Sequence, residues 1–168
     1  MLCDKKHSHV QWRDFKMNVL VCDDDQQIVD SIIEELKKKS EETHVALRFY
    51  GFSQPSQINL SLPYDIALLD IDMGETNGIE LARKLRAENG NIVIIFITNF
   101  IQYAPEGFEV QAFRYLLKAD FSAKLDSYFD SAVQEAVSYT HLFAPSPEYW
   151  MGASTFRTLH DSQNCSDR

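Results

Sequence analysis

The sequence predicts an α/β fold, with a parallel β-sheet covered by helices on both faces. Two observations carry this prediction. Short apolar runs, typical of strands buried on both faces, recur along the chain, and segments with apolar residues at helical spacing separate them. Strand and helix alternate five times, as a doubly wound parallel sheet requires. With 168 residues and 45% hydrophobic content, the chain is long enough for one domain with a substantial core.

Five segments are predicted as strands. The third and fourth, residues 66–70 and 92–97, are the clearest because nearly every residue in them is apolar. The first covers residues 18–22 and ends in three consecutive acids. The second and fifth strands are expected at residues 45–50 and 112–117.

Helices are predicted after the strands, where apolar residues recur every three or four positions. Ile28, Ile32 and Leu36 mark the first, which closes in three lysines that suit the negative end of the helix dipole. Residues 51–63 contain Gly, Ser and Pro, so only a short helix near residues 56–60 is expected. The remaining three helices are expected over residues 78–89, 100–110 and 125–139.

The two ends of the chain lack these patterns. Residues 1–16 have no apolar period and are predicted to form a disordered extension, and residues 17–139 are predicted to form the domain. Pro145 and Pro147 oppose a helix, and the residues after them have no period, so residues 140–168 are predicted as an unstructured tail.

Charge and cysteine content narrow the possible functions. The net charge is −9, whereas nucleic-acid-binding domains are more often basic, so we expect this chain alone to bind no nucleic acid. No apolar run is long enough to span a membrane, and the polar N-terminus does not resemble a secretory signal. The three cysteines are widely spaced, which indicates a reducing, cytoplasmic compartment, and Cys22 is expected in the core.

Polar side chains follow four of the predicted strands. Asp23 and Asp24 follow the first, Asp70 ends the third, Thr98 follows the fourth and Lys118 follows the fifth. The carboxyl ends of parallel strands meet at one edge of the sheet, where ligands bind in open α/β folds. The sequence therefore predicts a cleft with three carboxylates, one hydroxyl and one ammonium group.

Three carboxylates at close range repel one another, and Lys118 alone cannot neutralise them. A hard divalent cation can, and carboxylate oxygens favour Mg²⁺ or Ca²⁺. Asp70 would then remain ionised and could attack a phosphoryl group as a nucleophile. The cation and Lys118 would stabilise the charge on the transferred group, and Thr98 could donate a hydrogen bond to the product.

At this point the chain resembles the receiver domain of two-component response regulators, over residues 17–139. The segments that carry the resemblance are Val21-Cys22-Asp23-Asp24, Leu69-Asp70-Ile71-Asp72-Met73 followed by Gly78, Thr98, and Tyr115-Leu116-Leu117-Lys118. The residues around Thr98 and the segment 113–118 are similar to receivers of LytTR-type regulators. The resemblance implies a flavodoxin-like, five-stranded parallel sheet with strand order 2-1-3-4-5 and five helices.

The resemblance also implies a role for each acid. Asp70 would accept a phosphoryl group from a phosphohistidine of a sensor histidine kinase. Asp24 would bind Mg²⁺ directly, Asp23 would bind it directly or through water, and Asp72 would contribute its backbone carbonyl. The chain would then be a switch that catalyses only its own phosphorylation and dephosphorylation, and no metabolic enzyme.

The remaining implied roles concern the switch. Lys118 would pair with the phosphate, Thr98 would move toward it, and Tyr115 would turn inward as Thr98 moves. The surface formed by the fourth helix, fifth strand and fifth helix would then bind a partner or a second copy of the chain. The output is expected to be transcriptional.

Three departures from the family pattern bear on these roles. Gly74 stands where many receivers have proline, so a looser loop is expected. Ala119 stands where the family usually has a proline after a cis bond; a cis bond before a non-proline residue costs ~2.5–4 kcal/mol, so the bond here is either trans with a shifted loop or strained. A LytTR-type regulator would continue into a DNA-binding domain, and we hypothesise that residues 140–168 replace it through truncation or a misread frame.

Other functions use similar residues. Haloacid-dehalogenase-type phosphatases also open on two aspartates after a strand, but their motif has threonine at the position of Gly74. An EF-hand loop starting at Asp70 would need glycine at Glu75 and glutamate at Leu81. A receiver-like interaction module without phosphorylation remains open.

Overall fold

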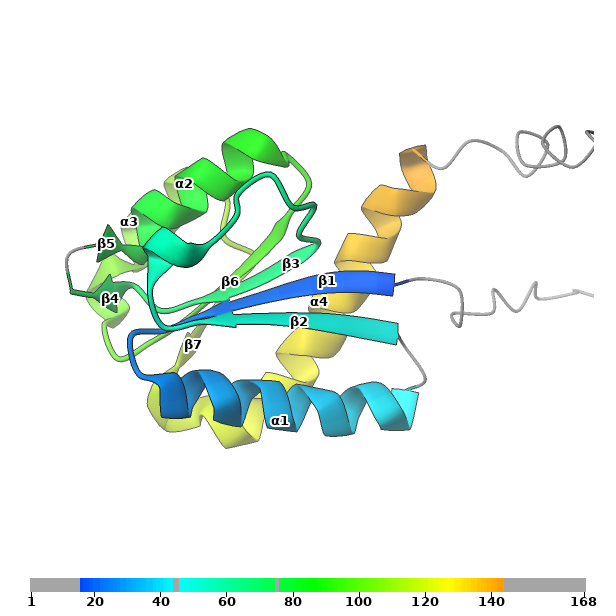
Figure 1. Ribbon diagram of the computed structural model, residues 1–168, viewed down its shortest axis with the longest axis horizontal. Helices are drawn as coiled ribbons and strands as arrows, with labels where there is room; N and C mark the ends of the chain where they lie inside the picture. Colours follow the sequence, from blue (N-terminus) through cyan, green and yellow to red (C-terminus); the bar gives the residue numbers. More distant parts are fainter. Residues whose placement is uncertain (1–15, 44–45, 75, 144–168) are drawn as a thin grey trace, which may run out of the picture.

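A computed structural model of the protein describes residues 16–43, 46–74 and 76–143. Five parallel strands form the central sheet in the order β2-β1-β3-β6-β7, which is the predicted 2-1-3-4-5 order with the strands numbered as in Figure 1. The strands are β1 (Lys16–Cys22), β2 (Ala46–Phe52), β3 (Ile66–Leu69), β6 (Val93–Thr98) and β7 (Arg114–Leu117). The predicted α/β class and strand order are confirmed.

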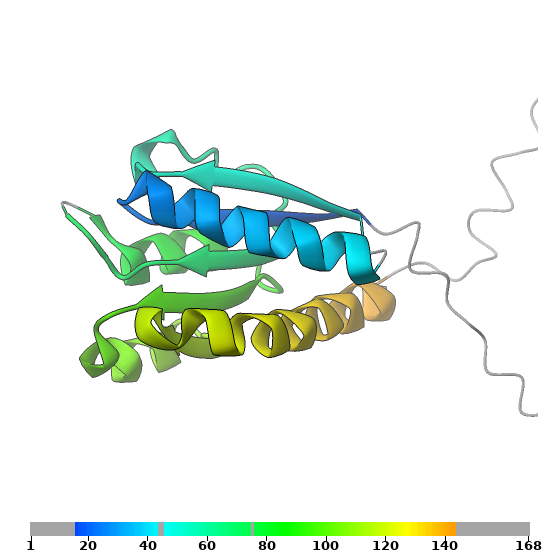
Figure 2. The ribbon, with the colours of Figure 1, turned by 90° about the horizontal axis from the view of Figure 1, so that it is seen from below.

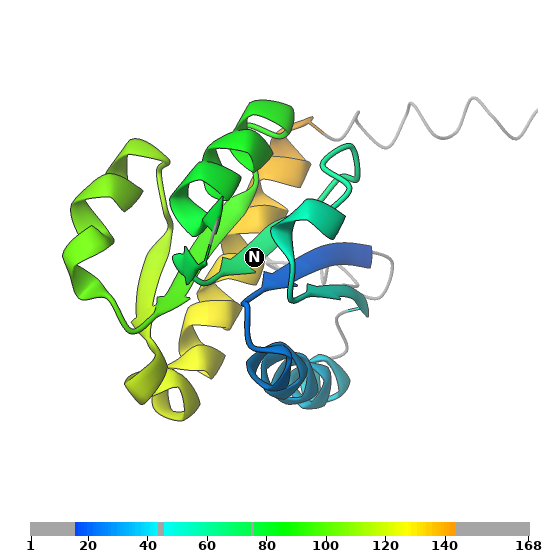
Figure 3. The ribbon, with the colours of Figure 1, turned by 60° about the vertical axis from the view of Figure 1, so that its left-hand side comes forward.

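Helices cover both faces of the sheet. The α-helices are α1 (Gln26–Thr43), α2 (Gly78–Glu88), α3 (Ala104–Glu109) and α4 (Phe121–Phe143). Helices α1 and α4 lie side by side on one face, and α2 lies on the other (Figures 2 and 3). Short 3₁₀ turns complete the list: η2 (Pro55–Gln57), η3 (Ile101–Tyr103) and η4 (Lys118–Asp120).

Alternate residues of the strands fill two separate cores, as the two-residue period of a strand requires. In β1, Val19 and Val21 pack with α1 and α4, whereas Leu20 and Cys22 pack with α2 on the opposite face. All residues of β3 and β6 are buried, which explains why these two strands were the clearest in the sequence.

Two predicted elements differ from the structure. In place of the short helix near residues 56–60, the structure has the 3₁₀ turn η2, so the described residues contain four α-helices and not five. Pro55 starts this turn, and Ile58 and Tyr64 are buried against the sheet, so side-chain burial holds the segment without a helix. The segment around Gly74, where the sequence predicted a looser loop, is flanked by a small antiparallel pair of strands, β4 (Asp72–Met73) and β5 (Thr76–Asn77).

The ends of the domain also differ from the prediction. Strand β1 already begins at Lys16, and α4 continues past residue 139 to Phe143, so residues 140–143 belong to a helix and not to the tail. The rest of the predicted extension and tail lies outside the described residues. No helix in the described part of the chain is long and apolar enough to cross a membrane.

Candidate metal and phosphoryl site

The strand register brings the predicted site residues to one edge of the sheet. Cys22 pairs with Leu69 across β1 and β3, so Asp23 and Asp70 emerge side by side. Thr98 pairs with Leu117 across β6 and β7, so Lys118 emerges next to Thr98. The four strand ends that the sequence singled out therefore meet at the carboxyl edge, as predicted.

Three carboxylates gather there. Asp23, Asp24 and Asp70 can each offer one oxygen such that the three atoms lie within 4.8 Å of one another. Asp23 and Asp70 are 1% and 5% exposed, whereas Asp24 is exposed to solvent. Two buried acids beside an open one form a donor set of hard oxygens with an accessible side, which fits a divalent cation such as Mg²⁺.

Asp72 and Asp25 lie next to this cluster without joining it. The side chain of Asp72 is exposed in β4, so the role predicted for its backbone carbonyl stays a prediction. Asp25 accepts a hydrogen bond from the backbone N–H of Gln27 at 2.9 Å, and its own N–H donates to Asp23 Oδ1 at 3.0 Å. Asp25 thus caps the start of α1 and orients Asp23.

Lys118 contacts two of the acids. Its Nζ lies 2.6 Å from Asp70 Oδ2, to which it donates a hydrogen bond, and 2.6 Å from Asp23 Oδ2, with which it forms an ion pair. Burial by itself would lower the pKa of Lys118, but the contacts with the two carboxylates outweigh it and raise that pKa. Lys118 is therefore a cation, and one positive charge still faces three carboxylates.

Burial raises the pKa of Asp23, whereas by itself it would lower that of Lys118. The pKa of Asp23 is raised because desolvation disfavours the charged carboxylate more than Lys118 favours it. A second cation, bound at this edge of the sheet, would offset the cost of keeping the Asp23 carboxylate charged.

The peptide bond between Lys118 and Ala119 is trans, since the described residues contain no cis bond. The turn η4 that follows still lets Lys118 reach both acids.

The loop after Asp70 depends on two glycines. Asp70 Oδ1 accepts a hydrogen bond from the N–H of Ile71 at 2.7 Å, and the N–H of Gly78 donates to the carbonyl of Ile71 at 2.8 Å. A Cβ atom at Gly78 would overlap the carbonyl oxygen of Asp70. Gly74 has φ +71°, a left-handed conformation that proline cannot adopt, so this loop differs from one with proline at that position.

Thr98 at the end of β6 and Tyr115 in β7 are the two predicted switch residues. Thr98 is fully buried, and its Oγ1 accepts a hydrogen bond from the N–H of Phe100 at 3.2 Å. The hydroxyl of Tyr115 donates to the carbonyl of Tyr103 at 3.0 Å, and its ring lies 5.1 Å from that of Phe96, centroid to centroid. Burial raises the pKa of Tyr115 to about 12, so this hydroxyl is a donor at neutral pH.

Sequence reasoning missed the residues that hold Tyr115. A Cβ atom at Gly107 would overlap the Tyr115 ring, so this glycine lets α3 approach β7 closely. The carbonyl of Tyr103 is the acceptor for the Tyr115 hydroxyl. A glycine inside a predicted helix was the available signal, since it costs helix stability unless packing requires it.

Cys22 is buried behind the site, as predicted. Its Sγ donates to Met73 Sδ at 3.5 Å, and burial, followed by the nearby acids, raises its pKa from 9.0 to about 12. The thiolate is the reactive form, so a shift of this size lowers its fraction roughly a thousandfold below pH 9.

This shift predicts an unreactive thiol. In a variant with Cys3→Ser and Cys165→Ser, a disulfide reagent at pH 8 should label Cys22 at least ~100-fold more slowly in the native protein than in urea. The absorbance of the thiol that the reagent releases gives the labelling rate in the native protein and in urea. Equal rates in the two states would contradict the burial described here.

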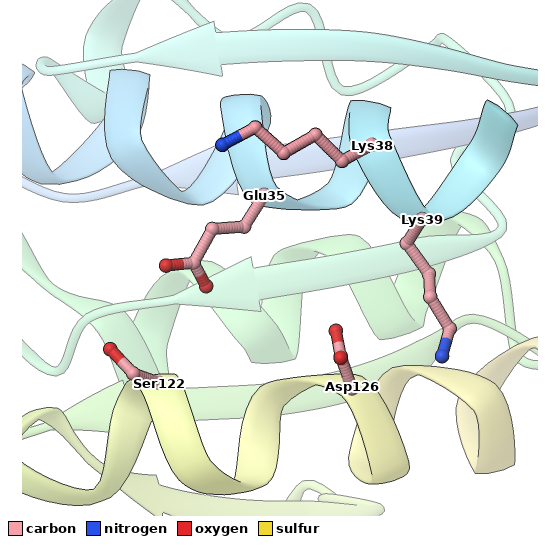
Figure 4. A pocket seen from close by; sticks show the side chains of 5 residues that line it. All are labelled: Glu35, Lys38, Lys39, Ser122 and Asp126. Carbon is pink, nitrogen blue, oxygen red and sulfur yellow. The ribbon is translucent and has the colours of Figure 1, made fainter. Parts of the chain in front are cut away.

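A second hollow lies between α1 and α4, away from the acids. Glu35, Lys38, Lys39, Ser122 and Asp126 line it, and Figure 4 shows Glu35 extending toward α4 and Asp126 toward α1. Lys39 also forms an ion pair with Asp130 at 3.0 Å. Its acids and lysines balance one another, so this hollow lacks the excess negative charge that distinguishes the acidic cluster.

Comparison with known sequences decides the family. The sequence model of the response regulator receiver domain matches residues 19–128. This chain belongs to the response regulator receiver family. The receiver family consists of phosphoacceptor switches, and the resemblance found in the sequence is confirmed.

Curated relatives of this receiver include LytT and LytR regulators. The sensory transduction protein LytT of Bacillus subtilis is 31% identical over 102 residues, covering 61% of this chain and 42% of that protein. An uncharacterised response regulatory protein of Vibrio cholerae is 33% identical over 101 residues, covering 60% of this chain and 35% of its own length. The receiver thus spans less than half the length of these relatives.

Solved structures share the fold. The response regulatory domain of mrkE from Klebsiella pneumoniae has a TM-score of 0.63 at 21% identity, covering 73% of this chain and 99% of that one. The response regulator TrrA from Thermotoga maritima, in complex with Mg²⁺ and BeF, has a TM-score of 0.59 at 23% identity, covering 69% and 98%. At these identities the likeness concerns the fold alone.

Proposed function

We propose that this receiver is a phosphorylation-dependent switch whose phosphoacceptor is Asp70. The observation that carries the proposal is the contact of one lysine with two buried acids beside a third, open acid, at the carboxyl edge of the sheet. Such a cluster combines a nucleophilic carboxylate with a cation and a site for a second one. A phosphatase would share the nucleophile, whereas its family pattern fails at Gly74.

The metal site would use the predicted ligands. Asp23, Asp24 and Asp70 would hold Mg²⁺ with their carboxylates, and Asp72 would add its backbone carbonyl. Bound Mg²⁺ would neutralise charge on the phosphoryl oxygens and so supply Lewis-acid stabilisation. The fit rests on the hard oxygen donors and on the net negative charge that Lys118 leaves uncompensated.

Phosphoryl transfer would proceed at Asp70 Oδ2. A carboxylate oxygen of Asp70 forms a bond to phosphorus as the bond from phosphorus to the donor's histidine nitrogen breaks, and the donor keeps that electron pair. Asp70 Oδ1 is held by the N–H of Ile71, so Oδ2 is the oxygen whose partner, Lys118, can follow the new phosphate. Lys118 then donates to a phosphoryl oxygen.

The switch would begin at Thr98. Its hydroxyl now bonds within the β6–η3 loop and would exchange this partner for a phosphoryl oxygen. Tyr115 would respond to the space that Thr98 leaves and turn inward. The phosphate shifts the population toward the active shape only through such differential contacts.

The partners follow from this function. The phosphoryl donor would be a sensor histidine kinase, and the face formed by α3, β7 and α4 would bind a second copy of the chain. This face corresponds to the fourth helix, fifth strand and fifth helix of the sequence prediction. The name of the LytR relative, a transcriptional regulatory protein, supports a transcriptional output. We propose that this chain acts in the cytoplasm and by itself binds neither nucleic acid nor a membrane.

Acetyl phosphate tests the proposal. With Mg²⁺, the intact mass of the protein should increase by one labile phosphoryl group, and Asp70→Asn should abolish the increase. Asp72→Asn is the matched control: its side chain is exposed, so it should still be phosphorylated. Continuous release of phosphate without a labelled protein would indicate a phosphatase, and neither signal would indicate an interaction module. EDTA should prevent labelling of the parent protein.

A further inference from the structure

Helix α3 is held differently at its two ends. Its N-terminal end follows the turn η3, and no side chain caps it at Tyr103. Its C-terminal end leads into the segment 110–113, which enters β7 at the edge of the sheet opposite the acids. Figure 3 shows α3 beside α2, and two arginines of α2, Arg83 and Arg86, contact the C-terminal end of α3 and the residues that follow it.

Arg86, in the last turn of α2, holds the C-terminal end. Its guanidinium donates to the carbonyls of Gly90 at 2.8 Å, Gln111 at 3.1 Å and Val110 at 3.3 Å. It therefore ties the loop after α2 to the loop after α3. The planar fork of arginine can reach several carbonyls at once, which a single ammonium group cannot.

The tied segment is ordered in other ways. Gln111 adopts φ +53°, which is uncommon for a residue with a side chain, and its N–H donates to the carbonyl of Phe108 at 3.1 Å. The N–H of Ala112 donates to the carbonyl of Gly107 at 2.9 Å. Val110 is 2% exposed in the core beside α2. None of these groups touches the acidic cluster.

The N-terminal end depends on the switch residue itself. The hydrogen bond from the Tyr115 hydroxyl to the Tyr103 carbonyl ties η3 to β7. The N–H of Phe100 donates a hydrogen bond to Thr98 Oγ1, and the N–H of Tyr103 donates one to the carbonyl of Phe100 at 3.4 Å. The Tyr115 ring also packs on Gly107 within α3, but no contact of Thr98 or Tyr115 named above involves the carbonyls that Arg86 holds. Movement of Thr98 and Tyr115 would therefore release the N-terminal end and leave the Arg86 contacts in place.

We propose that Arg86 is a positioning residue that fixes the C-terminal end of α3 as a pivot, while the Tyr115–Tyr103 hydrogen bond is a latch at the other end. Switching then turns α3 about Arg86 and displaces its N-terminal end most. The inference rests on the proposed function, since the phosphoryl group supplies the movement of Thr98. The pivot adds to that function a prediction of which end of α3 moves on phosphorylation: the N-terminal end.

Amide hydrogen exchange measured by NMR on the full chain tests the pivot. Beryllofluoride with Mg²⁺, compared with Mg²⁺ alone, should accelerate exchange at the Tyr103 amide roughly tenfold or more and change the Gln111 and Ala112 amides by less than about twofold. Similar acceleration at both ends would overturn the pivot. If beryllofluoride causes no spectral change at Asp70, the proposed function fails instead.

Variants of Arg86 test the anchor without any phosphoryl mimic. In the free protein, Arg86→Met should accelerate exchange at Gln111 and Ala112 by roughly tenfold or more, because it removes every donor and keeps the aliphatic stem. The rate of phosphorylation by acetyl phosphate should stay within about twofold, since Arg86 does not touch the site. Unchanged exchange at these two amides would overturn the anchor.

Two further variants sharpen this result. Arg83→Met is the matched control on the same helix: its ion pair with Glu109 is exposed on both sides, so it should change these amides by less than about twofold. If Arg86→Met does not fold, Arg86→Lys keeps the charge but reaches fewer carbonyls, and the same two amides should still exchange faster than in the parent. Exchange at parental rates in Arg86→Lys would also overturn the anchor.

Discussion

Lys118→Ala should leave Mg²⁺ binding intact and abolish the response to phosphorylation. The lysine competes with the metal for Asp23 and Asp70, so its removal should make Mg²⁺ bind at least as tightly as in the parent. It is also the donor placed to follow the phosphoryl oxygens, so phosphorylation by acetyl phosphate should slow by on the order of 100-fold. Titration calorimetry measures the first effect, and intact mass against time measures the second.

Lys124→Ala is the matched control for this prediction. Lys124, in the first turn of α4, pairs with Asp120 at the end of η4, and the Lys124 side chain is 49% exposed. Its replacement should change neither Mg²⁺ affinity nor the phosphorylation rate. If Lys118→Ala instead shows parental rates and a parental NMR response to beryllofluoride at Tyr115, the role assigned to Lys118 is wrong.

Gly78→Ala should destabilise the fold and displace the acceptor. The added Cβ would overlap the carbonyl oxygen of Asp70 and approach the Cα of Ile71, and both are backbone atoms that no side-chain rotation can move aside. We expect the free energy of unfolding to fall by about 3 kcal/mol. Urea denaturation followed by circular dichroism measures this change, and the phosphorylation rate of the folded fraction should also fall.

Gly90→Ala provides the control for that substitution. A Cβ atom at Gly90 would meet nothing within 4 Å, so we expect a change within about 0.5 kcal/mol. Equal stability of Gly78→Ala and the parent protein would show that the Asp70 loop moves freely. The close approach described here would then not constrain the acceptor.

The sequence predicted most of the site because its residues follow a local rule. Asp70 and Lys118 each come directly after an apolar strand, and parallel strands bring their ends to one edge whatever the loops do. It named Asp23 and Asp24, and not Asp25, as the acids that follow the first strand, although all three are acids at the same strand end. Only the backbone of the turn decides that Asp24 joins the cluster and Asp25 caps α1.

Loop conformations account for the other differences. The sequence left two conformations open for the bond after Lys118, and the structure has it trans with both ion pairs formed. The short helix near residues 56–60 is absent from the described residues because burial of Ile58 and Tyr64 holds an irregular segment in its place. Such outcomes depend on packing between distant segments, which periodicity along the chain does not record.

The sequence by itself determined the α/β class and the acids and lysine at the carboxyl edge, because burial on both faces and strand-end position are written in consecutive residues. The strand order came from the resemblance to receiver domains. Only the tertiary structure decided that Gly107 packs on Tyr115 and that Arg86 joins two loops through three carbonyls. Arg86 reaches Val110 and Gln111, which lie 24 and 25 residues further along the chain, and the geometry of all these contacts exists only once the helices have packed on the sheet.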